Sequence, residues 1–247
     1  MDTQEQAIAA LQRMTDESRA VVFFGGAGVS TESGIPDFRS IDGLYNQQWK
    51  YPPETIISRS FFDENPEEFF RFYRAKLLIQ GVKPNAAHYK LAEMERKGKL
   101  TGVVTQNIDG LHQLAGSTSV YELHGSIQRN YCMNCGAPYT ITEAFSQPGI
   151  PRCTKTSGCS GIIKPDVVLY EESLDQTVVE GAIRVLSRAD MLIIGGTSLS
   201  VYPAAGLIRY FTGRHFVLIN KTQTASDAGA DLVIHGNIGE ILPRISV

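Results

Sequence analysis

The chain has 247 residues, and its 23 Lys and Arg against 26 Asp and Glu give a formal net charge of −3. With 43% hydrophobic and 20% charged residues it is neither a disordered nor a collagen-like chain, and its length fits one large domain or one domain with a lobe. A pI near 6.0 and the lack of an apolar stretch of roughly 20 residues argue against nucleic-acid binding and against a membrane span.

The first elements alternate between helix and strand patterns. Apolar residues at helical spacing over 7–14 predict an N-terminal helix. The run 20–24 is apolar throughout and ends in glycines, which is typical of a parallel strand buried on both faces. Asn65-Pro66 followed by two acids predicts the start of another helix, and a further one is expected over 85–98.

The second half of the chain continues this alternation. Further strands are expected at residues 102–105, 191–194, 216–219 and 231–234, with a helix over 175–188. Alternating buried strands and helices predict an α/β fold with a doubly wound, Rossmann-like parallel sheet. The segment 131–164 breaks the rhythm because it is rich in Gly, Pro, Ser, Thr and Cys, and we expect it to form a smaller inserted domain of zinc-ribbon or helical type.

The four cysteines form two pairs with metal-site spacing. Cys132-x2-Cys135 is followed, after 17 residues, by Cys153-x5-Cys159. Four thiolates bind zinc tetrahedrally and leave no open position, so such a site would hold loops together without activating water. Disulfides or free thiols are the alternatives. The polar, acidic N-terminus is unlike a signal peptide, so we expect a reducing, cytoplasmic location that favours zinc.

Two glycine-bearing turns follow predicted strands: the first begins at Gly25-Gly26 after the strand 20–24, and the second is Gly195-Gly196-Thr197-Ser198 after the strand 191–194. Gly26-x-Gly28 begins a dinucleotide fingerprint, but Thr31 occupies the third glycine position, so a turn without a ligand is the alternative. A following helix N-terminus would offer N–H donors to a phosphate. The chain then enters residues 33–39, where Pro36 ends any helix early. An ordinary dehydrogenase would instead continue through a helix to a second strand with an acidic residue for the ribose hydroxyls, so this segment disfavours that class.

Polar side chains also follow the strand at 102–105. Asn107 and Asp109 offer an amide and a carboxylate to one small polar molecule. His124, at a strand end next to Gly125, has the character of a general base, with a hydrogen-bonded structural histidine as the alternative. The structural interpretation is the one we give to the remaining histidines, His88, His112, His215 and His235.

Taken in order, these patterns resemble the sirtuin family of NAD-dependent protein deacylases. The matching segments are Gly26-Ala27-Gly28-Val29-Ser30, Gly34-Ile35-Pro36-Asp37-Phe38-Arg39, Thr105-Gln106-Asn107-Ile108-Asp109, His124-Gly125, the four cysteines, Lys164-Pro165-Asp166-Val167-Val168, Gly196-Thr197-Ser198-Leu199 and Val201-Tyr202-Pro203-Ala204-Ala205. They cover nearly the whole chain, and its compact length is similar to that of bacterial and archaeal members.

The resemblance implies an NAD-dependent protein-lysine deacetylase that transfers the acyl group to ADP-ribose and releases nicotinamide, so that NAD is consumed. It implies His124 as general base on a ribose hydroxyl and Asn107 as a second catalytic residue, which together with Asp109 would hold the ribose and the nicotinamide carboxamide. The implied cofactor-binding residues are Gly26, Ala27, Gly28, Ser30, Asp37, Phe38, Arg39, Gln106, Asn107, Ile108, Asp109, Gly196, Thr197, Ser198 and Asn220.

The resemblance also implies partners and a division of the chain. An acyl-lysine protein or peptide would add a strand along Val167, Val168, Leu169 and Tyr170. One structural Zn²⁺ would bind Cys132, Cys135, Cys153 and Cys159. The Rossmann-like NAD-binding domain would comprise residues 1–34, 80–124 and 165–247, with a cofactor loop and helical module at 35–79 and a zinc-binding module at 125–164.

Two departures bear on the substrate. Glu171-Glu172 stands where Gly-Glu is usual, and the extra carboxylate is expected to favour basic residues in the substrate. Sirtuins that remove succinyl or malonyl groups resemble one another in a Tyr-x-x-Arg pair, and here Phe70 and Tyr73 stand at those positions. A buried acyl carboxylate would lack a charge partner, so we expect an uncharged acyl group, acetyl first. Arg71 or Arg74 would substitute if the helix register differed.

Three classes of function compete. A dehydrogenase leaves the Pro36 loop unexplained, and a zinc-ribbon binding module leaves the α/β domain unexplained. A NAD-consuming transferase explains both parts of the chain. Within that class the alternatives to deacetylation are protein ADP-ribosylation, which starts by breaking the same nicotinamide–ribose bond, and removal of a different acyl group.

Overall fold

The computed structural model describes residues 3–38, 43–46, 48–79 and 81–247. Its larger sheet is parallel and has six strands in the spatial order β3-β2-β1-β7-β8-β9. These strands are β3 (Val120–Glu122), β2 (Leu100–Thr105), β1 (Val21–Gly25), β7 (Met191–Gly195), β8 (His215–Asn220) and β9 (Leu232–His235). The chain runs outward in one direction from β1 and in the other from β7, so the predicted doubly wound sheet is confirmed.

Strand β1 lies at the centre of this sheet, which explains its unbroken apolar sequence. Phe23 pairs with Val103 of β2 on one side and with Ile193 of β7 on the other. Phe23 packs into a core with α1, α5 and α9, while the adjacent Phe24 packs into a second core with α8 on the opposite face. Both faces of the strand are therefore buried, and a polar residue in it would have no solvent-exposed side.

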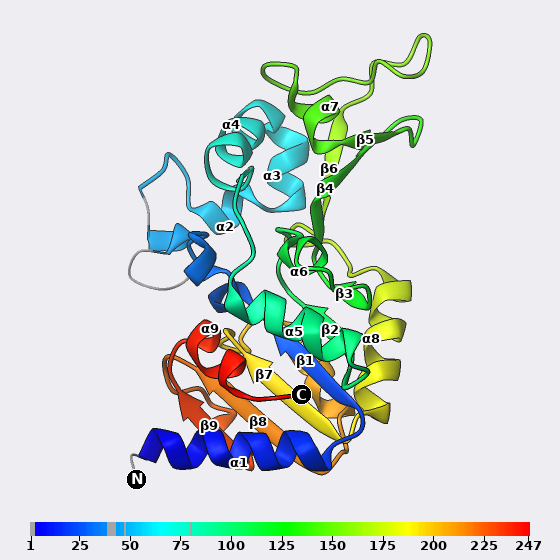
Figure 1. The fold of residues 1–247 in the computed structure, drawn as a ribbon. Coiled ribbons are helices and arrows are strands. Elements are labelled where there is room, and N and C mark those ends of the chain that lie inside the picture. The colour runs from blue at the N-terminus through cyan, green and yellow to red at the C-terminus, as the bar shows by residue number, and fades with distance from the viewer. Residues whose placement is uncertain (1–2, 39–42, 47, 80) are drawn as a thin grey trace.

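Helices cover both faces of this sheet (Figure 1). The helices that surround the large sheet are α1 (Thr3–Glu17), α5 (Ala86–Arg96), α6 (Leu111–Leu114), α8 (Gln176–Arg188) and α9 (Ile238–Ile241). Their starts follow local capping, since Asn85 accepts a hydrogen bond from the backbone of α5 and Asp175 from that of α8. Within the described residues, none of the helices combines the length and the apolar character needed to cross a membrane.

Short 3₁₀ helices form most of the remaining connections. They are η1 (Ala27–Val29), η2 (Thr31–Ser33), η3 (Leu44–Asn46), η4 (Ala204–Tyr210), η5 (Asp227–Gly229) and η6 (Leu242–Arg244). Three of them, η1, η2 and η3, lie in the segment that follows β1, where the sequence predicted a turn and then a long loop.

A smaller layer sits at one end of the large sheet (Figure 1). Its helices are α2 (Pro53–Ile56), α3 (Arg59–Glu64), α4 (Pro66–Lys76) and α7 (Ile141–Phe145), and its antiparallel sheet consists of β5 (Pro138–Thr140), β4 (Gly125–Cys132) and β6 (Ile163–Val167). Phe69, Phe70 and Tyr73 of α4 share a core with Phe145 of α7. The predicted boundary between residues 164 and 165 falls inside β6, and the three-part division stays a prediction.

Candidate active site

A cavity of about 890 Å³ lies at the carboxyl ends of β1, β2 and β7, where the direction of strand connection reverses. Its wall contains every predicted catalytic, cofactor and peptide residue that the structure describes: Gly26, Ala27, Gly28, Ser30, Asp37, Phe38, Gln106, Asn107, Ile108, Asp109, His124, Val167, Val168, Leu169, Tyr170, Gly196, Thr197, Ser198 and Asn220. Arg39 lies outside the described residues.

The first glycine turn packs directly against the second. The Gly28 N–H donates to the Gly196 carbonyl at 2.8 Å, and a Cβ on Gly28 would lie 2.8 Å from Gly196 Cα. Glycine is therefore required here by the approach of two backbones. The helix expected after this turn forms only as two short 3₁₀ helices, η1 and η2: the Thr31 hydroxyl donates to the Gly28 carbonyl at 3.0 Å, and Gly34 ends η2 with a φ of 89°. Any phosphate would meet turn N–H groups without a long helix behind them.

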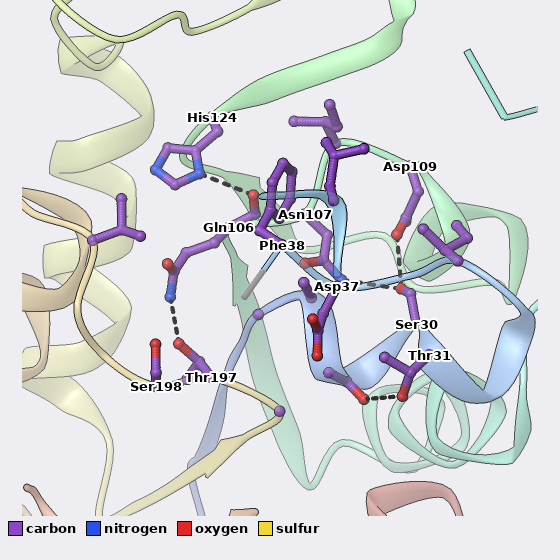
Figure 2. A pocket seen from close by; sticks show the side chains of 18 of the residues that line it. Ser30, Thr31, Asp37, Phe38, Gln106, Asn107, Asp109, His124, Thr197 and Ser198 are labelled. Atoms are coloured by element: carbon purple, nitrogen blue, oxygen red, sulfur yellow. Dashed lines mark hydrogen bonds between the residues drawn. The ribbon is translucent and has the colours of Figure 1, made fainter. Parts of the chain in front are cut away.

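The second turn is held by side chains that reach it from two strands. Asn220, at the end of β8, accepts from the Thr197 N–H and donates to the Thr197 carbonyl, both at 3.1 Å. The Gln106 amide, after β2, donates to the Thr197 hydroxyl at 3.1 Å (Figure 2). Asn220 and Gln106 were predicted as cofactor contacts, and in this structure they fix the shape of the turn.

Ser30, Asn107 and Asp109 form one hydrogen-bonded network (Figure 2). The Ser30 hydroxyl donates to the Asp109 carboxylate at 2.7 Å and accepts from the Asn107 amide at 3.0 Å, while the other Asp109 oxygen accepts from the Leu111 N–H at 2.9 Å. Burial raises the pKa of Asp109 above its ordinary value, and the hydrogen bonds from Leu111 and Ser30 oppose that rise. The network therefore presents an oriented amide and carboxylate in a desolvated corner.

His124 lies on the other side of the cavity, in the tight turn between β3 and β4 (Figure 2). Gly125 makes this turn possible with a φ of 75°, and a Cβ there would lie 2.0 Å from the Asp166 carbonyl oxygen. His124 Nδ1 lies 2.9 Å from the Gln106 carbonyl, which can only accept, so Nδ1 carries the proton and Nε2 is left as a basic nitrogen. Burial lowers the pKa of His124, and the bond to Gln106 partly opposes this shift.

The predicted peptide segment is already bonded along most of its length. Strand β6 ends at Val167, and the next N–H, that of Val168, donates to the His124 carbonyl at 2.9 Å. The Tyr170 N–H and carbonyl pair with the backbone of Ile57 and Arg59, both at 3.0 Å. Within the described residues the Val168 carbonyl has no hydrogen-bond partner. Strand addition along all four predicted residues is thus restricted, and Val168 offers the open acceptor.

A buried ion pair positions this segment. Lys164 is 2% exposed, and its ammonium donates to the Val167 carbonyl at 2.9 Å and to Glu172 at 3.1 Å. Glu172 also accepts from the Leu169 N–H at 2.8 Å. Burial lowers the pKa of Lys164, and its interactions with Glu172 oppose that shift. Sequence reasoning recognised Lys164 only as part of a motif, because nothing in the pattern indicates where its ammonium points.

Glu171 adopts the backbone conformation that glycine would favour, with a φ of 75°. Its carboxylate accepts from the Ser60 N–H at 2.8 Å and from the Ser60 hydroxyl at 3.0 Å, in the first turn of α3. These bonds offset the backbone strain, and they engage the carboxylate that was expected to select basic substrates.

We expect Glu171→Ala to be less stable than Glu171→Gly by about 1 kcal/mol, because both variants lose the bonds to Ser60 but only alanine retains the strained φ. Urea unfolding of the two variants measures the difference. Equal midpoints would show that the left-handed conformation carries no strain in this loop.

The helix positions expected to line the acyl end do not do so. Phe70 and Tyr73 are 1% and 0% exposed, pack inside the core of the smaller layer and are not among the residues that line the cavity. The lining residues of this region are Lys76, the last residue of α4, and Leu77. Apolar side chains that do line the cavity, such as Ile57, are what supports an uncharged acyl group.

Sequence reasoning missed part of the wall. Residues 221–225 line the cavity directly after β8, and Tyr202 lines it near β7 with 75% of its surface exposed. The rule that ligands meet the carboxyl ends of parallel strands would have found 221–225, because the segment follows a strand and its first four residues are polar.

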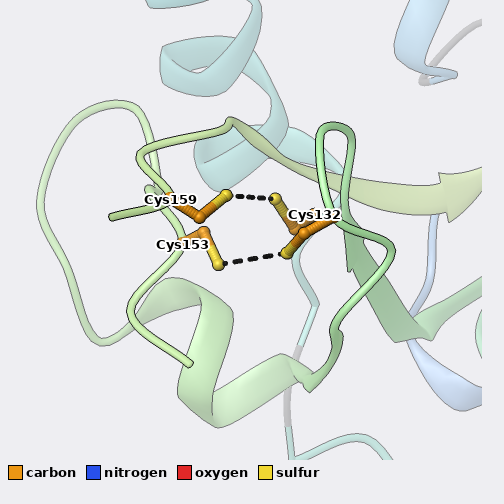
Figure 3. A group of neighbouring side chains, drawn as sticks. Cys132, Cys153 and Cys159 are labelled. Atoms are coloured by element: carbon orange, nitrogen blue, oxygen red, sulfur yellow. Dashed lines mark hydrogen bonds between the residues drawn. The ribbon is translucent and has the colours of Figure 1, made fainter. Parts of the chain in front are cut away.

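The four cysteines come together at the far end of β4 (Figure 3). Their sulfur atoms all lie within 4.8 Å of one another, with 3.6 Å both between Cys132 and Cys159 and between Cys135 and Cys153. Zinc–sulfur bonds of about 2.3 Å in a tetrahedron place sulfurs about 3.8 Å apart, so the group fits a zinc ion. The cluster is separate from the cavity, as a structural site would be.

Comparison with known proteins decides the family. The Sir2 family model matches residues 26–203. A protein of Clostridium acetobutylicum named NAD-dependent protein deacetylase is 57% identical over 241 residues, which cover 96% of this chain and 97% of that protein. The chain belongs to the Sir2 family. A second protein with that name, from Cutibacterium acnes, is 51% identical to this Sir2 protein over an alignment that covers 95% of this chain and 96% of the relative.

Solved Sir2 structures have the same fold as this Sir2 protein. One, in complex with deacetylated p53 peptide and 3′-O-acetyl ADP-ribose, has a TM-score of 0.87 and 38% identity, with 96% of each chain covered. Another, in complex with p53 peptide and NAD⁺, has a TM-score of 0.84 and 38% identity, again over 96% of each chain. The resemblance inferred from the ordered motifs is confirmed.

Proposed function

We propose that this Sir2 protein is an NAD-dependent protein-lysine deacetylase that transfers the acyl group to ADP-ribose and releases nicotinamide. The observation that carries the proposal is the cavity itself. His124, the Ser30–Asn107–Asp109 network and Val168 all line this one cavity, which supports the proposal. The names of the relatives and the ligands of the Sir2 structures support the same activity.

NAD, when bound, would supply a ribose carbon from which nicotinamide can depart. The chain would orient it with the two glycine turns at one end and with Asn107 and Asp109 at the other. The Asp109 carboxylate and the Asn107 amide act in a desolvated corner, where a preorganised dipole or charge stabilises developing charge more strongly than water does. The Val168 carbonyl would accept a hydrogen bond from the acyl-lysine amide.

His124 would act as general base. Its Nε2 would accept a proton from a ribose hydroxyl. The hydrogen bond that Nδ1–H donates to the Gln106 carbonyl would stabilise the imidazolium that results. Burial keeps the imidazole neutral before the reaction, which is the state a base requires.

Zinc is part of the proposal as a structural ion. Cys132, Cys135, Cys153 and Cys159 would hold it as four thiolates, with no open coordination position. A reducing compartment would keep these thiols from forming disulfides, which is consistent with the cytoplasmic location expected from the sequence.

We expect Asp109→Asn to lower the rate of NAD use about 10- to 100-fold and to weaken inhibition by nicotinamide, because the amide keeps the shape but loses the charge of the carboxylate. Initial rates over a nicotinamide titration measure both effects. Unaltered nicotinamide inhibition would remove Asp109 from the nicotinamide site.

The test of the function is mass spectrometry of the protein incubated with NAD and an acetyl-lysine peptide, with a succinyl-lysine peptide in parallel. Loss of acetyl together with O-acetyl-ADP-ribose is the expected result. Faster succinyl removal would overturn the acyl assignment. Nicotinamide release with ADP-ribose on protein and the acetyl group intact would instead indicate an ADP-ribosyltransferase.

A further inference from the structure

Two tyrosines join the walls of the cavity that the proposed function assigns to different ligands. The hydroxyls of Tyr45 and Tyr170 lie 2.7 Å apart, although the residues are 125 positions apart in the chain. Tyr45 belongs to η3 in the cofactor loop, and Tyr170 ends the peptide segment 167–170. Both side chains line the cavity.

Tyr45 is tied to the residues expected to cover NAD. Its N–H donates to the Phe38 carbonyl at 2.9 Å, and its ring packs edge-to-face against the Phe38 ring with centroids 5.5 Å apart. The adjacent Leu44 N–H donates to the Asp37 carbonyl at 2.8 Å. Asp37 and Phe38 line the cavity, so the position of the Tyr45 ring and that of this wall depend on each other.

Tyr170 is tied to the residues expected to meet the peptide. Its backbone pairs with Ile57 and Arg59, and two residues earlier Val168 donates to the His124 carbonyl. Tyr170 is 38% exposed, so its ring is partly open to solvent and its orientation depends on what its hydroxyl bonds. Tyr45 is the hydroxyl partner that the structure provides.

We propose that the Tyr45–Tyr170 hydrogen bond acts as a strut that pre-organises both walls, so that each tyrosine is a positioning residue for the ligand on the opposite side. The inference rests on the proposed function. Without the strut, each ligand would have to order its own wall on binding, which lowers its affinity. A bond between two partly exposed neutral hydroxyls is worth a factor of about two to ten in an equilibrium constant.

The proposal predicts a cross-site effect. Tyr45→Phe should weaken acetyl-lysine peptide binding about two- to tenfold with no NAD present, and Tyr170→Phe should weaken ADP-ribose binding by a similar factor with no peptide present. The double variant should lose no more than either single variant, because all three lack the same bond. Phenylalanine keeps the ring contacts, so the melting temperature should change little.

Isothermal titration calorimetry of the full chain with each ligand alone measures these affinities. Tyr89→Phe is the matched control, because Tyr89 is 52% exposed on α5 and lies outside the cavity wall. Effects confined to the ligand on the variant's own side, or additive effects in the double variant, would overturn the strut. If the wild-type chain bound neither ADP-ribose nor the peptide, the proposed function itself would fail; normal binding by wild type and by both Phe variants would overturn the strut alone.

Discussion

Replacing His124 with alanine should lower the rate of deacetylation about 100- to 10,000-fold, which is the range that a positioned general base contributes. The geometry supports a large effect, because His124 lines the cavity and the Gln106 carbonyl fixes its tautomer, which leaves Nε2 as the basic nitrogen. Binding of ADP-ribose and of the peptide should persist, because His124 is proposed to move a proton and the turns and the Val168 carbonyl are proposed to hold the ligands.

The pH dependence gives a second measure of the same residue. Burial lowers the pKa of His124 from its ordinary value of 6.5, so the neutral base is present through the neutral range and the wild-type rate should fall only at more acid pH. The Ala variant should lack that limb.

Two buried histidines limit how far the pH–rate profile can be extended to acid pH, because their protonation destabilises the fold. Burial lowers the pKa of His88 to about 4 and that of His112 to about 3. The folded chain therefore binds fewer protons than the unfolded chain below pH 6.5, so this part of the stability is present above pH 6.5 and is lost as the pH falls toward 4. Thermal melts at each pH separate unfolding from titration of His124.

Undiminished turnover by the His124→Ala variant would remove His124 from the mechanism.

Replacing Cys159 with alanine should release zinc and lower deacetylation at least about tenfold. Structural zinc contributes about 10–16 kcal/mol in zinc-finger peptides, so three remaining thiolates should not hold the module in one conformation. The effect should reach the cavity through two strands. Strand β4 runs from Gly125, next to His124, to Cys132, a proposed zinc ligand, and β6 leads from the module to Val167 at the peptide segment.

Metal analysis, activity and circular dichroism measure this outcome together. Ser157→Ala, an exposed position two residues from Cys159, is the control and should keep zinc and activity. The large sheet should keep its secondary structure in both variants, because its two cores contain no residue of the cysteine cluster. Full activity in a zinc-free Cys159→Ala protein would show that the module is not needed to position the site.

Much of the fold and of the site follows from sequence alone. The continuous apolar run of β1 specified a strand buried on both faces, and Asn85 specified the start of α5 through its side-chain cap. The resemblance to a family grouped Asn107 and His124 in one site, and both residues line the same cavity, at the carboxyl ends of β2 and β3. These features depend on local hydrogen bonding and on periodicity, which neighbouring residues determine.

Only the tertiary structure decided how the walls of the cavity are held. Tyr45 and Tyr170, or Ser60 and Glu171, meet across more than 100 positions of the chain, and no local pattern specifies such a contact. The inward orientation of Tyr73 likewise depends on the aromatic core that surrounds it, so helical register alone could not determine which residues of α4 reach the cavity. Sequence determined which chemical groups this site contains, and long-range packing determined where each of them points.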